Sequence, residues 1–265
     1  MNCKICNSET EIISTQKILQ KHSVNYHQCS NCKFIQTDEP FWLEEAYQNI
    51  ITSLDIGLIS RNLYLQKEIP LIIDTVFPQA KIMLDYGGGY GMLVRMLRDL
   101  GYNFFRQDLY CENLFAKHFD YSDSQVRKFD ILTAFEVFEH LANPLMEIEK
   151  MFELSENIIF STVLIPNPST GFENWWYVAP ETGQHIAFYS IDSLNFIARK
   201  FNSHFYTNGN NLHMFSKHKI GNKQIKRVFK SHKSIFELIF PEKRTRTSLL
   251  QLDYNSILGN LKQKD

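Results

Sequence analysis

The sequence has little proline, little glycine, almost no net charge and no long apolar run. Its 265 residues include 8 Pro and 11 Gly, which excludes a collagen-like or low-complexity chain. The formal net charge of −1 argues against a strongly basic nucleic-acid binder. No apolar stretch approaches the roughly 20 residues that a membrane helix needs, and the first residues lack the apolar core of a signal peptide. We therefore expect a cytoplasmic protein without a membrane partner.

Apolar residues are plentiful: hydrophobic residues make up 44% and aromatic residues 14% of the chain. This suffices for one large domain or two small ones with a real core. Residues 81–108 give a short apolar run, a glycine-rich turn, helical spacing that ends at Gly101, and a second apolar run. That order predicts a βαβ unit in a parallel sheet. The pattern continues with a strand at 129–135, a helix from Asn143-Pro144, a strand at 157–165, a helix capped by Ser190 or Asp192, and a hairpin over 204–216.

The turn after Asp85 reads Gly87-Gly88-Gly89-Tyr90-Gly91. A dinucleotide fingerprint would need glycine where Met92 stands, and the Gly-Lys-Ser/Thr ending of a P-loop is absent. Glycines let the backbone approach a ligand closely, and the helix that begins near Met92 offers N–H groups to a carboxylate. Asp108 ends the next strand, where its carboxylate can accept hydrogen bonds from ribose hydroxyls.

Two stretches in register resemble the class I S-adenosylmethionine-dependent methyltransferases. The first is Leu84-Asp85-Tyr86-Gly87-Gly88-Gly89-Tyr90-Gly91, followed by Asp108. The second runs from Phe129 to His140, reads Phe-Asp-Ile-Leu-Thr-Ala-Phe-Glu-Val-Phe-Glu-His, and is similar to the family's fourth-strand signature. The resemblance implies an α/β fold with a Rossmann-like, seven-stranded sheet covered by helices on both faces. It also implies S-adenosylmethionine as the cofactor.

The resemblance further implies roles for single residues around the cofactor. The implied contacts are Gly87, Gly89 and Gly91 along the cofactor, Asp108 at its ribose, Phe119 beside the adenine, Phe135 and Glu136 at the methionine end, and Asp85 orienting the loop near the methionine amine. Arg106-Gln107 departs from the family, which usually has a small residue there. We expect this departure to loosen the geometry around the ribose. The alternative is an ordinary glycine-rich turn in an α/β domain.

Four of the five cysteines, Cys3, Cys6, Cys29 and Cys32, fall in the first 32 residues as two Cys-x-x-Cys pairs. Each two-residue gap lets one turn present two sulfurs, as a tetrahedral Zn²⁺ site requires. The alternatives are redox pairs or free thiols. A closed Cys₄ site leaves no position for water, so we expect it to hold structure or substrate and to perform no chemistry.

The patterns together predict four parts along the chain. They are a zinc-ribbon-like module over 1–38, a helical lid or linker over 39–80, a methyltransferase core over 81–216 with a substrate loop at 166–189, and a basic or helical extension over 217–265. Within the second part, helical spacing over 41–77 should be interrupted at Pro70.

A zinc module joined to this core is similar to the sugar C-methyltransferases that act on nucleotide-linked keto-sugars. That subgroup places a base histidine in the loop matched here by Gly183-Gln184-His185-Ile186. An acid directly precedes the histidine in the family, whereas Gln184 stands there in this chain. The resemblance therefore implies C-methylation of a nucleotide-linked keto-sugar, with His185 as general base.

Carbon methylation beside a ketone requires a proton to leave an sp³ carbon, and a neutral histidine suits that task. His185 is the first candidate and His140 the second, although either can be purely structural. Tyr189 and Tyr177 are candidates to hydrogen-bond a substrate oxygen. Trp175 and Trp176 can stack on a sugar or base, or simply close the loop over the core.

Three rival functions remain open from the residues. One is an RNA methyltransferase that docks RNA through the zinc ribbon, to which the seven Lys and Arg of 217–233 would contribute. Against it, the fourth strand ends in Ala134-Phe135-Glu136-Val137 and not in Asn-Pro-Pro-Tyr, and Tyr110, not proline, precedes Cys111. The others are an O-methyltransferase on a sugar or phenol, and a binding protein with an inactive methyltransferase fold.

Overall fold

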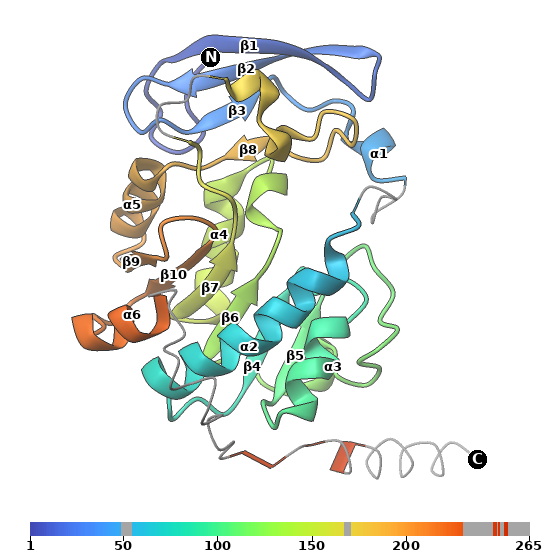
Figure 1. The fold of residues 1–265 in the computed structure, drawn as a ribbon, viewed down its shortest axis with the longest axis vertical. Helices are drawn as coiled ribbons and strands as arrows, with labels where there is room; N and C mark the ends of the chain where they lie inside the picture. The colour runs from blue at the N-terminus through green and yellow to red at the C-terminus, as the bar shows by residue number, and fades with distance from the viewer. Residues whose placement is uncertain (49–54, 167–170, 230–245, 248, 250–251, 254–265) are drawn as a thin grey trace, which may run out of the picture. The chain divides into compact units, whose positions relative to one another are not determined.

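The computed structural model describes residues 1–48, 55–166, 171–229, 246–247, 249 and 252–253 (Figure 1). The chain divides into two compact units. One consists of Met1–Ile56 and Ala134–Lys219, and the other of Gly57–Thr133 and Ile220–Asp265. Among the helices described, none is both long and apolar enough to cross a membrane.

The N-terminal residues form an antiparallel sheet with strand order β1-β2-β3-β8. Its strands are β1 (Thr10–Ile18), β2 (His22–Cys29), β3 (Ile35–Thr37) and β8 (Ala187–Phe188). Tyr26, Ile35, Trp42 and Phe188 belong to one buried apolar cluster in this unit. Strand β8 comes from the segment just after His185, so the N-terminal residues complete their sheet with a distant part of the chain (Figure 1).

A second sheet has six strands in the order β5-β4-β6-β7-β10-β9. Its strands are β4 (Met83–Tyr86), β5 (Phe104–Gln107), β6 (Ile131–Ala134), β7 (Asn157–Ser161), β9 (His204–Thr207) and β10 (Leu212–Ser216). Strand β4 pairs in parallel with β5 and β6, while β10 pairs antiparallel with β7 and β9. The α/β class is confirmed, but the expected seven-stranded sheet is wrong: the sheet has six strands and is mixed.

The segment between β5 and β6 accounts for the difference in strand number. It pairs with β5 at a single parallel bridge, Arg106↔Asp120, and then forms the short 3₁₀ helix η1 (Tyr121–Asp123). Asp120 and Asp123 form a capping box. Such local side-chain bonds to backbone compete with a strand ladder, so the segment turns where a seventh strand would extend.

The helices are α1 (Leu43–Ala46), α2 (Leu58–Val76), α3 (Met92–Asp99), α4 (Pro144–Leu154), α5 (Ile191–Lys200) and α6 (Asn222–Phe229), with short 3₁₀ turns η2 (Phe138–His140), η3 (Phe172–Asn174) and η4 (Trp176–Val178). Ser190 caps α5, as expected, by accepting the Ser193 N–H at 3.0 Å. The interruption expected at Pro70 is wrong, because α2 continues through it. Burial of Ile69, Ile72 and Ile73 on one face of α2 offsets the hydrogen bond that proline removes.

The four-part division of the chain stays a prediction. Parts of it lie outside the described residues: 49–54 of the lid, 167–170 of the substrate loop, and most of the extension after residue 229. Within the basic segment 217–233, α6 covers Asn222–Phe229, and residues 230–233 lie outside the described part.

Candidate functional site

The glycine-rich turn joins β4 to α3 in the unit that contains Gly57–Thr133. Gly87, Gly89 and Gly91 have φ of 70°, 53° and 84°, the left-handed region that favours glycine. A Cβ on Gly91 would lie 2.8 Å from Asn113 Oδ1. At Gly89 a Cβ would meet nothing within 4 Å, so the backbone there is open to a ligand.

Asp108 connects the glycine turn to the loop that follows β5. Its Oδ2 accepts the Gly89 N–H at 2.9 Å, and its Oδ1 accepts the N–H groups of Tyr110 and Cys111 at 2.8 and 2.7 Å. A carboxylate offers about four lone-pair positions. These three backbone bonds therefore leave roughly one position for a ligand hydroxyl, which fits one hydrogen bond to a ribose.

Arg106 is held more firmly at this site than its sequence position predicts. Its guanidinium is buried, donates through Nε to Asp120 Oδ1 at 2.7 Å, and donates through Nη1 to the carbonyls of Cys111, at 2.9 Å, and Gly89. The expected loosening around Asp108 is therefore wrong, because Arg106 ties together the two loops that Asp108 also joins. The only sequence signal was a long basic residue inside a short strand that begins with two phenylalanines.

Gly88 lacks a side chain, and the packing of Arg106 leaves no room for one. A Cβ there would lie 2.8 Å from Arg106 Cγ and 3.0 Å from Asp85 Oδ2. Real Cβ atoms essentially never approach a neighbour that closely. The second of the three consecutive glycines is thus required by the arginine that packs across it.

Asp85 lies beneath the turn and is 3% exposed. The Thr133 hydroxyl donates to its Oδ1 at 2.6 Å. Burial raises the pKa of Asp85 to about 7, and the charge of Asp108 adds to this, while the Thr133 hydrogen bond and Arg106 lower it. When Asp85 is ionised, the Thr133 hydroxyl stabilises its carboxylate, which has little water around it.

The remaining predicted cofactor residues fall in both units. Phe119 is buried, with the Arg98 guanidinium carbon 3.6 Å from its ring centroid. Phe135 and Glu136 follow β6 and are half-buried. Glu136 has a φ of 54° and is held twice by Ser161: its N–H donates to Ser161 Oγ at 2.8 Å, and Ser161 donates to its Oε1 at 2.7 Å. Their contacts with a cofactor stay predictions.

The two predicted histidines lie together in the unit that contains Met1–Ile56 and Ala134–Lys219. The ring centroids of His140 and His185 are 4.9 Å apart and the rings are nearly perpendicular, at 80°. His140 Nδ1 is 3.0 Å from the Gln184 carbonyl oxygen and 3.0 Å from the Tyr47 hydroxyl. His185 Nδ1 is 2.6 Å from the Tyr177 carbonyl oxygen. Because a carbonyl can only accept, both contacts require the hydrogen on Nδ1.

Gln184, which replaces the acid of the resembling family, holds the segments around the histidines. Its side-chain amide donates to the Ala46 carbonyl at 2.9 Å, while its backbone carbonyl accepts from His140 Nδ1. The contact between Tyr47, at the end of α1, and His140 is not predicted by the sequence. No local signal could have shown it, since 93 residues separate the two.

Tyr189 and Tyr177 are both buried beside this pair. The Tyr189 hydroxyl donates to the Phe138 carbonyl at 3.0 Å. Burial, together with the negative charge of Glu139, raises the pKa of both phenols well above the usual value. Both phenols therefore stay protonated, and Tyr189 holds η2, the turn that carries His140.

The four N-terminal cysteines converge as predicted, with their sulfurs within 4.8 Å of one another. The Sγ atoms of Cys3 and Cys32 are 3.6 Å apart, and those of Cys6 and Cys29 are 3.4 Å apart. These distances exceed the roughly 2.0 Å of a disulfide and approach the roughly 3.8 Å edge of a zinc–thiolate tetrahedron. Hydrogen bonding from the Cys32 thiol lowers the pKa of Cys3 to about 5. The cluster fits a Zn²⁺ ion.

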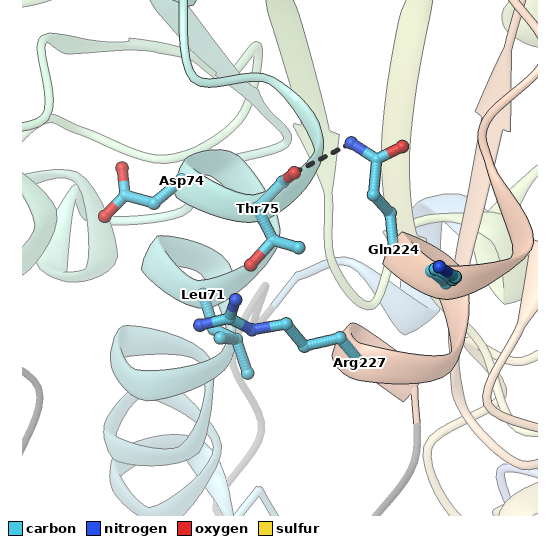
Figure 2. A pocket seen from close by; sticks show the side chains of 6 residues that line it. Leu71, Asp74, Thr75, Gln224 and Arg227 are labelled. Carbon is cyan, nitrogen blue, oxygen red and sulfur yellow. Dashed lines mark hydrogen bonds between the residues drawn. The ribbon is translucent and has the colours of Figure 1, made fainter.

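A pocket of about 340 Å³ lies between α2 and α6. Figure 2 shows Gln224 reaching from α6 to the Thr75 carbonyl, a bond of 2.9 Å, with Arg227 and Leu71 beside it. The lining residues of this pocket include none of the predicted cofactor, catalytic or metal residues. We assign it no part in the reaction.

Several solved structures are similar to this chain. The plantazolicin methyltransferase BpumL in complex with SAH is 10% identical, with a TM-score of 0.46 over 66% of this chain and 90% of that one. The magnesium protoporphyrin IX methyltransferase ChlM from Synechocystis PCC 6803 with bound SAH is 10% identical, with a TM-score of 0.41 over 67% and 95%. An O-methyltransferase family 2 protein from Planctomyces limnophilus DSM 3776 in complex with apigenin is 11% identical, with a TM-score of 0.47 over 66% and 61%. No curated protein matches the sequence.

Residues 60–204, more than half of the chain, match the family described as a methyltransferase domain. The chain belongs to this family. It is an S-adenosylmethionine-dependent methyltransferase, as the glycine turn and Asp108 predicted.

Replacing Gly88 by alanine should weaken S-adenosylmethionine binding about tenfold or more, because the new Cβ displaces Arg106 from the turn. Isothermal titration calorimetry measures this, and tenfold corresponds to about 1.4 kcal/mol. Gly221→Ala is the matched control, since its Cβ would meet only the flexible end of Gln224, at 3.3 Å. Equal affinities in Gly88→Ala and the wild type would show that the turn does not depend on this packing.

Asp85 should make the protein less stable as pH rises. Its pKa of about 7 in the folded state exceeds the unfolded value of about 3.9, so the folded protein binds a proton that the unfolded chain releases. The stabilisation is complete below about pH 4 and is lost as pH rises through about 7, with an upper bound of about 4 kcal/mol. Urea unfolding at several pH values should show this loss for the wild type relative to Asp85→Asn.

The Thr133→Val variant tests whether Asp85 causes this pH dependence of stability. Without the hydroxyl that donates to Asp85, the ionised carboxylate is less stable and the loss should move to higher pH. A wild type and an Asp85→Asn variant with parallel stability profiles from pH 5 to 8 would contradict the buried proton.

Proposed function

We propose that this methyltransferase acts on a small molecule and transfers the methyl group to carbon, with a nucleotide-linked keto-sugar as substrate. The observation that carries the proposal is the hydrogen bond of 2.6 Å between His185 Nδ1 and the Tyr177 carbonyl. It fixes the proton on Nδ1 and leaves a lone pair on Nε2 of the neutral ring. A ring in that tautomer is prepared to take a proton from a substrate carbon.

The cofactor side of the proposal rests on the glycine turn. When bound, S-adenosylmethionine supplies an activated methyl group on a sulfonium centre. Gly89 provides open backbone, and Asp108 retains about one lone-pair position for a ribose hydroxyl. Asp85, with the pKa of its carboxyl raised by burial, favours a cationic amine nearby, because a positive charge stabilises its ionised form. These residues fit the cofactor.

The proton transfer follows from the contacts of His185. His185 Nε2 would accept the proton from the carbon next to the ketone. The electron pair left on that carbon would form the new bond to the methyl group as the methyl–sulfur bond breaks, with the electron pair of that bond going to sulfur and S-adenosylhomocysteine leaving. The resulting imidazolium keeps its Nδ1–H on the Tyr177 carbonyl, which stabilises the positive charge. His140, held by Gln184 and Tyr47, orients this ring from its edge.

The cysteine cluster is proposed to hold one structural Zn²⁺. Four sulfurs within 4.8 Å fill a tetrahedron, so no coordination position is left for substrate or water. The ion would fix the two cysteine-bearing turns at the ends of the sheet β1-β2-β3-β8.

His185→Ala should lower turnover by about 10²-fold or more, the usual contribution of a general base, with cofactor affinity unchanged. The assay follows methylated product by mass spectrometry, and the methylated atom by NMR, across a panel of nucleotide-linked keto-sugars. His218→Ala is the matched control, because its ring is 76% exposed and is bonded to Glu156. Full turnover in His185→Ala would remove this base, and a methyl group on oxygen would overturn the carbon assignment.

Protein dialysed against a moderate chelator should retain one zinc per chain, because a Cys₄ site binds it tightly. Elemental analysis measures this in the wild type and in Cys6→Ser, which should lose the ion. Cys6 is the least buried of the four, so its replacement disturbs packing least. Cys111→Ser, a buried cysteine outside the cluster, should keep it. A folded, metal-free wild type would contradict the zinc site.

A further inference from the structure

Glu139, His140 and His185 form a second cluster of metal-ligand side chains, separate from the cysteines. One ligand atom from each lies within 4.8 Å of the other two. Glu139 is completely buried, and the two histidines are half-buried. The Ile186 N–H donates to the Glu139 carbonyl at 2.9 Å, so the backbone holds η2 and the His185 segment together. We propose that these three residues bind a divalent metal ion.

The hydrogen bonds of both rings favour this use. Each Nδ1 donates to a backbone carbonyl, that of Gln184 for His140 and that of Tyr177 for His185. Metal-ligating histidines almost always donate their other ring N–H to such a group, which fixes the tautomer and the ring orientation. The Nε2 atoms of both rings then have the electronic form that a metal ion binds.

The ligand set also fits a definite class of ion. Two imidazoles and one carboxylate suit Mn²⁺, Fe²⁺, Co²⁺ or Zn²⁺ and leave coordination positions open. Ligand atoms of one such ion lie about 3 Å apart, so binding draws together ligand atoms that lie within 4.8 Å of one another. A bound cation also offsets the free energy of burying the Glu139 carboxylate.

The metal site goes beyond the proposed function, because it depends on these three side chains and on no substrate. It does compete with one assignment there: the Nε2 lone pair of His185 can take a proton or bind the ion, but not both. With the ion present, its open position would polarise a substrate oxygen, which acidifies the neighbouring C–H. The base role proposed for His185 then belongs to the metal-free form of the protein.

The test is a titration of the full-length protein with Mn²⁺, followed by loss of the EPR signal of free Mn²⁺. Thiolate sites prefer zinc, whereas carboxylate and imidazole ligands suit Mn²⁺, so the cysteine cluster does not interfere. We expect one Mn²⁺ per chain in the wild type and in His218→Ala. Affinity should fall at least tenfold in His185→Ala and in Glu139→Gln.

Binding of S-adenosylmethionine and circular dichroism verify that each variant is folded. A wild type that binds no Mn²⁺ would overturn the metal site, as would a folded His185→Ala or Glu139→Gln protein that binds it with unchanged affinity. Neither result bears on the proposed methyl transfer, because the product assay tests that proposal separately. Conversely, absence of a C-methylated product with one Mn²⁺ bound per chain would overturn the proposed substrate and leave the metal site in place.

Discussion

The hydrogen bonds of the buried Arg106 guanidinium are the interactions on which the glycine turn and the loop after β5 depend. A charge that has lost its water must be matched by partners, and Arg106 finds them in Asp120 and in the carbonyls of Gly89 and Cys111. Each partner belongs to a different segment, so one side chain sets the relative positions of the glycine turn, the loop after β5 and the edge bridge to Asp120.

The same constraint explains features that look unrelated in the sequence. Gly88 lacks a side chain because the Arg106 stem lies where a Cβ would be. Asp108 accepts hydrogen bonds from three backbone N–H groups. Arg106 holds the Gly89 and Cys111 backbones in place for these bonds by donating to their carbonyls. Lysine could not replace this arginine, because a single ammonium cannot present donors in a fixed fork toward three directions.

The sequence predicted what local patterns encode. The β4 strand, the glycine turn, α3 with Gly101 after it, the Ser190 cap and the β9–β10 hairpin all follow from spacing and capping within about 30 residues. It failed where the decisive contact is distant in the chain. The loss of a seventh strand to a capping box at Asp120, the passage of α2 through Pro70, and the Tyr47–His140 contact depend on partners that spacing cannot reveal. The convergence of the four cysteines was predictable, because two Cys-x-x-Cys pairs carry a spacing signal of their own.

The N-terminal sheet connects the cysteine cluster to the segment that carries His185. Cys29 ends β2 and Cys32 lies between β2 and β3, so the proposed ion would fix the turn that leads into β3. Strand β3 pairs with β8, and the Thr37 N–H donates to the Ile186 carbonyl at 3.2 Å. Ser190 also donates to the Cys32 carbonyl at 2.7 Å. His185 directly precedes Ile186, so its backbone is positioned by the same strand that the cysteines anchor. The N-terminal sheet thereby positions the backbone that carries His185, the residue proposed as the base.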